Sequence, residues 1–209
     1  MTTKFFTNQG KNTLLEKFEG IFKYTQVENF DALVGYLRAS GYFAIRKFLK
    51  RVPKIRILVG INVDKVIKQY HQVGLEFTSN NEKILEEFNR DLKKDIQGST
   101  YNKETEEGIL EFIKDVSSKK IEIAAHPTKN IHAKIYIFKP KSFNQHNSGS
   151  VITGSSNLSA TGIGALPESN YEFNVELRDF DDVNYASKEF EKLWKESVDI
   201  LPADTIKDN

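Results

Sequence analysis

Two side chains in the middle of the sequence, His132 and Lys134, have the chemistry needed to act on a phosphate group. They lie in the segment 131–138, whose composition predicts a β-strand, and residues two apart in a strand project from the same face. A neutral imidazole can serve as a nucleophile or an acid, while an ammonium group can hold the charge of a phosphate. We therefore interpret His132 and Lys134 as the centre of a candidate site. The simpler alternative is a polar strand face covered by a loop.

Two later segments contain further groups that suit a phosphate. A Gly-Ser turn follows a predicted strand, and we expect it to begin a helix whose N-terminus would favour a bound anion. The phosphate-binding candidates in this turn are Ser155, Ser156 and Asn157. Glu172 lies near the start of a later predicted strand, where its carboxylate could accept the second ring N–H of His132 and fix its tautomer. The alternatives are an ordinary serine-capped turn and a surface carboxylate.

The composition excludes several other kinds of site. The 209 residues contain no cysteine, which excludes disulfides, cysteine-based zinc sites and thiol nucleophiles. No carboxylate-rich or paired-histidine motif indicates a metal ion. No apolar run could span a bilayer and no signal-peptide pattern is present, so we expect a cytoplasmic protein without a membrane partner.

Positive charge is concentrated locally, in residues 38–56 and 119–141, although the net charge is only +1. Between residues 38 and 56 there are seven basic residues and no acidic one, interleaved with aromatic residues. Such a run suits contact with a nucleic-acid backbone. The candidate nucleic-acid-binding residues are Arg46, Lys47, Lys50 and Arg51. The alternative is a solvated helix face.

Alternating strand and helix patterns must position these residues. The sequence predicts strands at 30–37, 54–60, 121–125, 131–138, 150–154 and 171–177. It predicts helices after a capping box at Thr13 and after Asp64, and at 42–50, 81–118 and 183–194. This order predicts an α/β or mixed α+β fold with a central, mostly parallel sheet flanked by helices.

Three motifs together resemble the phospholipase D superfamily, and specifically its nuclease-like branch. H-x-K at 132–134, G-S-x-N at 154–157 and N-x-E at 170–172 occur in the order typical of these proteins. The N-terminal half, with V-G-Y-L, S-G-Y-F and I-L-V-G, also resembles the phospholipase-D-like domain at the N-terminus of some bacterial helicases. The resemblance implies a single phospholipase-D-like sandwich over residues 1–209. It also raises the hypothesis that this domain is the N-terminal part of a longer helicase or restriction-type protein.

The resemblance also implies a catalytic role for each motif. His132 would attack phosphorus and form a phosphohistidine intermediate. Lys134 and Asn157, with Ser155 or Ser156, would hold the non-bridging oxygens. Glu172 would orient and polarise His132. Neither a metal nor any other cofactor is required.

Two departures from the family pattern bear on activity. The family often has an aspartate where this chain has Lys139, which favours a catalytically silent site. The reaction also needs two histidines, one to attack and one to protonate the leaving oxygen, whereas the chain has a single H-x-K. A homodimer that shares one active site would supply the second histidine.

The sequence therefore predicts a metal-independent phosphodiesterase of the nuclease type that acts on nucleic acid, most simply DNA, as a homodimer. Two alternatives stay open. One is a catalytically silent DNA-binding or dimerisation module of a helicase. The other is a hydrolase of a lipid or other small phosphodiester, because the motifs contact the phosphate and not the groups attached to it.

Overall fold

A mixed eight-stranded sheet forms the centre of the molecule. The computed structural model describes residues 3–60, 111, 114–166 and 169–199. The helix predicted after Asp64 and most of the one predicted at 81–118 lie outside these residues. The strands are β1 (Phe5–Thr7), β2 (Val27–Val34), β3 (Lys54–Val59), β4 (Ile121–Ala125), β5 (Ile135–Pro140), β6 (Ser150–Gly154), β7 (Phe173–Leu177) and β8 (Val198–Asp199). Their order in the sheet is β1-β7-β6-β5-β2-β3-β4-β8.

The expectation of a mostly parallel sheet is wrong. Only β2–β3 and β3–β4 pair in parallel, while the other neighbouring strands of the described sheet are antiparallel. The reason is that β5, β6 and β7 follow one another as an antiparallel meander, which needs no helical crossover. Apolar strand patterns do not encode strand direction, so the sequence alone could not distinguish the two arrangements.

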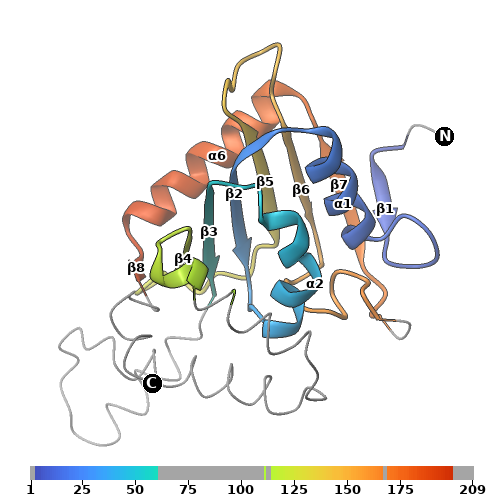
Figure 1. Cartoon of the computed structure of the whole chain (residues 1–209), viewed down its shortest axis with the longest axis horizontal. Helices are drawn as coiled ribbons and strands as arrows, with labels where there is room; N and C mark the ends of the chain where they lie inside the picture. Colours follow the sequence, from blue (N-terminus) through green and yellow to red (C-terminus); the bar gives the residue numbers. More distant parts are fainter. Residues whose placement is uncertain (1–2, 61–110, 112–113, 167–168, 200–209) are drawn as a thin grey trace, which may run out of the picture.

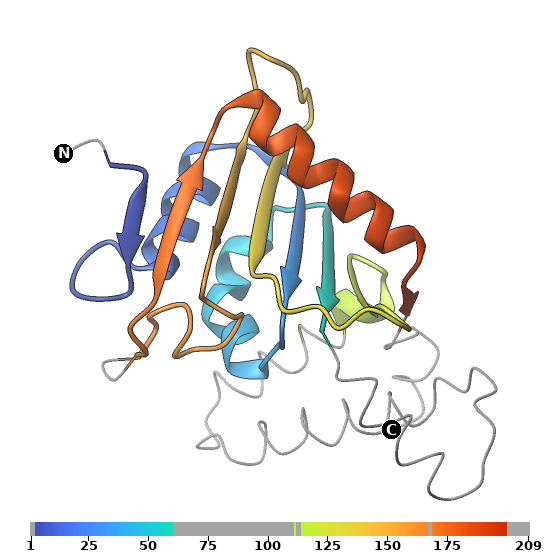
Figure 2. The same cartoon turned by 180° about the vertical axis from the view of Figure 1, so that it is seen from behind.

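Helices cover both faces of the sheet. Helices α1 (Leu14–Tyr24) and α2 (Ala39–Leu49) lie on one face, and α6 (Phe180–Lys195) crosses the other (Figures 1 and 2). The capping box predicted at Thr13 is confirmed, since its side chain accepts the Glu16 N–H and Glu16 reaches back to the backbone N–H of Thr13. Two short edge strands, β1 and β8, were not predicted, because strands this short carry no periodic pattern.

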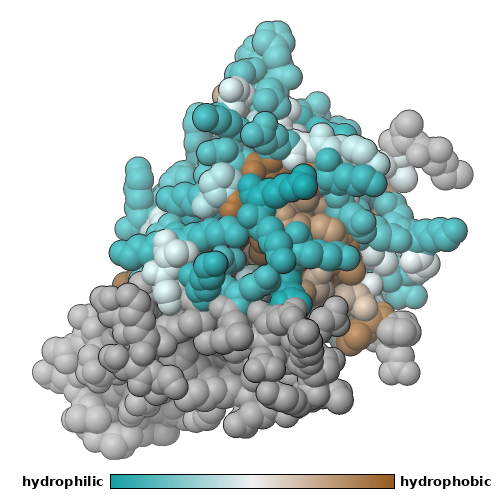
Figure 3. Space-filling model, viewed as in Figure 1, coloured by the Kyte–Doolittle hydropathy of each residue, from teal (hydrophilic) through white to brown (hydrophobic). Residues whose placement is uncertain are grey.

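The core beneath α1 is strongly aromatic. The Phe18 ring lies 5.8 Å from Phe30, 5.1 Å from Tyr136 and 5.3 Å from Phe138, measured between ring centroids. All four side chains are buried, so they fix α1 against the centre of the sheet. On the outside of this face, hydrophilic side chains surround an area of apolar surface (Figure 3). No helix in the described part of the chain is long and apolar enough to cross a membrane.

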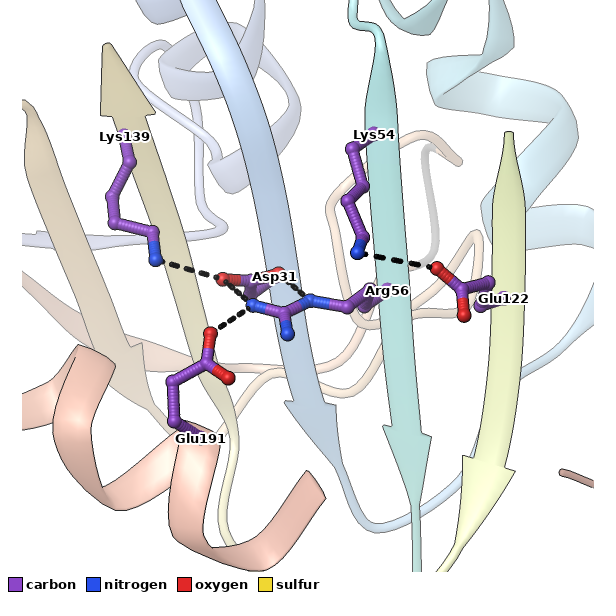
Figure 4. A network of polar contacts seen from close by, with 6 residues as sticks. All are labelled: Asp31, Lys54, Arg56, Glu122, Lys139 and Glu191. Atoms are coloured by element: carbon purple, nitrogen blue, oxygen red, sulfur yellow. Dashed lines mark hydrogen bonds and ion pairs between the residues drawn. The ribbon is translucent and has the colours of Figure 1, made fainter. Parts of the chain in front are cut away.

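A buried charge network lies between the sheet and α6. The Arg56 guanidinium donates two hydrogen bonds to Asp31, at 2.7 and 2.9 Å, and one to Glu191 of α6, at 2.6 Å (Figure 4). Lys139 approaches the same Asp31 carboxylate at 3.5 Å. Burial alone would lower the pKa of Arg56, but the hydrogen bonds to Asp31 and Glu191 outweigh this effect and raise its pKa above the ordinary value. The network therefore keeps its charges inside the fold and ties α6 to β2 and β3.

Breaking this network should destabilise the protein strongly. Arg56→Met leaves the fully buried Asp31 carboxylate without its main partner, and we expect the free energy of unfolding to fall by about 3–5 kcal/mol. Denaturant unfolding followed by circular dichroism measures the change. As a control, Lys4→Ala removes an exposed ion pair with Asp179 and should leave the free energy of unfolding nearly unchanged, because solvent screens exposed charges. Equal effects of the two substitutions would contradict this assignment.

Candidate active site

Several chain segments meet at one edge of the sheet. Strands β2, β3 and β6 end at this edge, whereas β5 and β7 begin there, because each pairs antiparallel with its neighbours. His132 and Lys134 therefore lie just before β5, and Glu172 lies just before β7. Residues 155–157 follow β6 at the same edge (Figure 2). The sheet topology thus brings the three predicted motifs together.

His132 and Lys134 are in direct contact. The Lys134 Nζ lies 3.0 Å from Nδ1 and 3.1 Å from Nε2 of His132, and it donates to the His132 carbonyl at 2.8 Å. Both residues precede β5, so the expectation that they lie inside a strand is wrong. The segment is nevertheless held to β6, since the Lys134 carbonyl accepts the Thr153 hydroxyl at 3.1 Å and the Gly154 N–H at 3.3 Å. His132 is exposed and Lys134 is buried, which leaves the imidazole open to a substrate and the ammonium beneath it.

Gly35, directly after β2, leaves room for the site. A Cβ atom at this position would lie 3.1 Å from Asn157 Oδ1 and 3.8 Å from both His132 Cδ2 and Lys134 Cε. These three side chains therefore meet around a residue that has no side chain, which leaves room for them. A second glycine, Gly60 after β3, lets the backbone of Ile131 come so close that a Cβ would overlap its carbonyl. Neither glycine was among the predicted site residues.

No helix begins after Gly154, so the predicted helix N-terminus is wrong. Residues 155–159 form a loop that pairs back to the end of β2 through the Leu37–Leu158 bridge. Asn157 Oδ1 accepts the backbone N–H of Tyr36 at 3.2 Å. Because this bond occupies the amide oxygen, the amide nitrogen is left as the donor for an anion.

Ser155 and Ser156 point in different directions. Ser155 is exposed, and its hydroxyl donates to the Glu172 carboxylate. Ser156 is fully buried and accepts a hydrogen bond from Asn174 at 3.0 Å. The structure thus gives the Ser156 hydroxyl a place under the loop and does not support its predicted role in phosphate binding. An alternation of exposed and buried residues within a loop has no signature in the sequence.

Glu172 is buried beside Lys134 but does not bond to His132. Among the hydrogen bonds of the described residues, its carboxylate has the Ser155 hydroxyl as its partner. The predicted contact in which Glu172 orients His132 is therefore not seen within this one chain. Burial lowers the pKa of Lys134, and the Glu172 carboxylate opposes this by favouring the charged ammonium.

Three buried polar residues support the site from below and were not predicted. The Tyr136 hydroxyl donates to the Ser156 carbonyl at 2.8 Å, and Asn174 and Asn8 both donate to the Ser156 hydroxyl. The alternation that places Tyr136 two residues after Lys134 could have identified it as a member of the same face. The remote Asn8 carries no comparable signal.

The predicted nucleic-acid-binding residues lie at the other end of the molecule. Helix α2 leads from the end of β2 to the start of β3, so its last turn lies at the edge opposite His132. Arg46 and Lys50 pair with Glu111, at 3.5 and 3.1 Å, and Lys47 lies over the Phe48 ring. Arg51 follows the helix and is exposed. The structure does not bring these four residues to the candidate site.

His126 is buried and held by hydrogen bonds within the fold. It is buried after β4, accepts the backbone N–H groups of Thr128 and Lys129 on Nδ1, and lies 3.1 Å from the Glu196 carboxylate through Nε2. The pKa of Glu196 is lowered to about 2 by its bonds to Lys129 and His126. Within the described ranges, no three histidine or carboxylate side chains gather in a way that could hold a metal ion.

The sheet, its helices and the convergent motifs define a protein of the phospholipase D class. The pattern of the family described as cardiolipin synthase, PLD-like domain, matches residues 37–194. The chain belongs to this phospholipase-D-like family, part of a superfamily of phosphodiesterases and nucleases. No curated protein sequence matches the chain.

Solved structures share the fold at low sequence identity. Nuc from Salmonella typhimurium, a phospholipase D family member, is 12% identical with a TM-score of 0.52, over 93% of this chain and 96% of that one. Phosphatidylserine synthase from Haemophilus influenzae Rd KW20 is 11% identical with a TM-score of 0.54, over 98% and 40%. Polyphosphate kinase from Porphyromonas gingivalis is 10% identical with a TM-score of 0.51, over 92% and 26%. Because these names differ so widely, the fold alone does not select a substrate.

The opposing influences on Lys134 predict a specific pH dependence. Because its pKa is lowered, Lys134 should lose its proton at a lower pH than an ordinary lysine does. The affinity of the site for inorganic phosphate should fall as the pH rises through this range. Glu172→Gln removes the charge that raises this pKa, so its affinity should be lost at a still lower pH. Lys134→Arg should keep its affinity to high pH, since arginine stays charged. Calorimetric titrations from neutral to alkaline pH test this, and superimposable profiles for all three proteins would contradict it.

Proposed function

We propose that the chain is a phosphodiesterase that cleaves nucleic acid through His132. The observation that carries the proposal is the meeting of His132, Lys134 and Asn157 around Gly35, with an ammonium 3.0 Å from an exposed imidazole. Nucleophilic displacement at a phosphate diester needs a nucleophile beside fixed groups, such as an ammonium and an amide N–H, that stabilise the negative charge of the phosphate oxygens.

In the first step, a ring nitrogen of neutral His132 donates its lone pair to phosphorus. The bond from phosphorus to one ester oxygen breaks, and that oxygen leaves with the bonding electrons and takes a proton from the imidazolium of the partner's His132. In the second step, water attacks the phosphohistidine and gives a proton back to the partner's His132. The phosphorus–nitrogen bond breaks, which releases a phosphate monoester and restores the first imidazole. Lys134 and the amide nitrogen of Asn157 neutralise the non-bridging oxygens, and Ser155 holds the Glu172 carboxylate that keeps Lys134 charged. No metal has a role in these steps.

Lys139 does not argue for a silent site. It lies at the far end of β5, five residues and about 17 Å along the strand from Lys134. There it pairs with Asp31 on the neighbouring strand β2 (Figure 4). The positive charge of Lys139 is thus paired with the Asp31 carboxylate. Its presence in place of an aspartate removes no group from the edge of the sheet where His132 lies.

Nucleic acid suits the surroundings of His132 better than a lipid does. Of the exposed large apolar side chains in the described part, most are aromatic, and Leu166 is the one aliphatic member. Two of them, Tyr36 and Tyr171, lie beside the site residues Gly35 and Glu172. The cationic α2 residues at the opposite edge, led by Arg46 and Lys47, would then contact a more distant part of the same polymer.

A phospholipid is the second candidate substrate, because the matching family is described as cardiolipin synthase and one structural neighbour is a phosphatidylserine synthase.

We also propose that residues 1–209 form a single domain, located in the cytoplasm and joined to a helicase or restriction-type protein. The similarity in fold to Nuc extends over nearly all of both chains, which supports the proposal of a single domain. The proposed link to a helicase rests only on the motifs in the N-terminal half.

Metal-independent cleavage tests the proposed function directly. The protein should cut plasmid and single-stranded DNA in the presence of EDTA, and His132→Ala should abolish cutting because it removes the nucleophile. His146→Ala serves as a matched control and should leave the rate unchanged, because His146 is exposed and lies between β5 and β6 at the opposite edge of the sheet. Gel electrophoresis of the products provides the measurement.

The same assay separates the alternatives. DNA binding without cleavage by either protein would support the silent module. Failure to bind nucleic acid, together with cleavage of phospholipid vesicles, would support the lipid enzyme. Either result would overturn the proposal.

If two chains share one active site, an inactive chain should also inactivate the wild-type chain with which it pairs. If each dimer needs both copies of His132, mixing wild-type chains with His132→Ala chains under conditions of subunit exchange should leave activity proportional to the square of the wild-type fraction. Sedimentation analysis should show a dimer. A linear loss of activity, or a strictly monomeric active protein, would rule out the shared site.

A further inference from the structure

The segment directly after β2 presents an exposed aromatic ring at the edge of the candidate active site. Tyr36 follows Gly35, which faces His132, Lys134 and Asn157. Consecutive Cα atoms are about 3.8 Å apart, so the ring is attached one residue from the point where these side chains meet. Tyr36 is 45% exposed, so its ring is accessible from solvent.

The backbone that carries this ring is fixed to the site. The Tyr36 N–H donates to Asn157 Oδ1 at 3.2 Å, and the Arg38 N–H donates to the Leu158 carbonyl at 3.0 Å. The same loop is bridged at Leu37. Burial raises the pKa of the buried Tyr136, and the Glu172 charge and the Tyr36 phenol add to this effect. A ring that is already positioned loses little conformational entropy when a ligand stacks on it.

The chemistry of the ring suits a nucleobase. The Arg38 guanidinium lies over the Tyr36 ring, with Cζ 5.7 Å from the centroid, so an aromatic face and a cation are combined beside a phosphate-binding residue. Proteins that bind single strands use this combination of stacked aromatic rings and positive charge. Bases in a duplex are already stacked on their neighbours and reach a protein ring only after extrusion.

We infer that Tyr36, supported by Arg38, is a stacking platform for an unpaired base next to the scissile phosphate, so that the site selects single-stranded nucleic acid. This inference rests on the proposed function and adds the strand state of its substrate. Tyr36 determines specificity in this scheme and takes no part in the chemical step.

The experiment compares three substrates of equal length in EDTA: a single-stranded oligonucleotide, its duplex and an abasic strand with the same backbone. Tyr36→Ala should raise KM for the single strand by about 5- to 150-fold, the range expected for the loss of one stacked base. KM for the abasic strand should stay within about twofold, since that strand has no base to stack. Tyr36→Phe should retain wild-type KM values because it keeps the ring.

Tyr24→Ala is the matched control. Tyr24 is also exposed and has a lysine, Lys23, over its ring at 5.2 Å, but it ends α1 at the opposite edge of the sheet. Its substitution should leave all three substrates unaffected. An equal loss with base-bearing and abasic strands, or no loss with either, would overturn the stacking role while leaving the nuclease intact. A wild-type protein that cleaves no nucleic acid would instead refute the proposed function, and the stacking role with it.

Discussion

The close contact between the backbones of Gly60 and Ile131 determines where the candidate site can form. Any side chain at Gly60 would overlap the Ile131 carbonyl, so the segment that leads to His132 can cross the end of β3 only because the residue there is glycine. The chain then enters β5 beside β2, with its direction reversed. Gly35 provides the corresponding space at the end of β2. Two glycines at neighbouring strand ends thus create the volume that His132, Lys134 and Asn157 share.

The parts of the fold that follow from local patterns were predictable from the sequence. The strands β4 and β6 and the capping box of α1 follow from composition and spacing alone. The direction of β5 was not predictable, because strand direction depends on pairing between residues distant in sequence. The missing helix after Gly154 has a similar cause, since the loop bonds to Tyr36 and Leu37, which follow β2 more than a hundred residues earlier in the chain. Local signals predicted candidate site residues that the fold brings together, and non-local pairing determines the hydrogen-bond partners of Ser156 and Glu172.

The charge network shows that a sequence motif and a structural role can separate. Lys139 stands at a position where an acid was expected, yet a carboxylate is still present nearby, supplied by Asp31 from the next strand. Arg56 is enclosed by Asp31 and Glu191 and also lies 4.9 Å from the Phe190 ring. The network therefore holds α6 against the sheet and lies at the other end of β5 from the candidate active site.

The buried Asn8 has a consequence for how the protein is made. It donates to both the Gly162 carbonyl and the Ser156 hydroxyl, which Asn174 also holds. The support of residues 155–157 therefore joins the segment directly after β1 to β7. A ribosome releases His132 and Lys134 before Asn174, so a nascent chain holds these two side chains before the support of residues 155–157 is complete. Strand β1 likewise waits for β7, its antiparallel partner, until that strand has been synthesised.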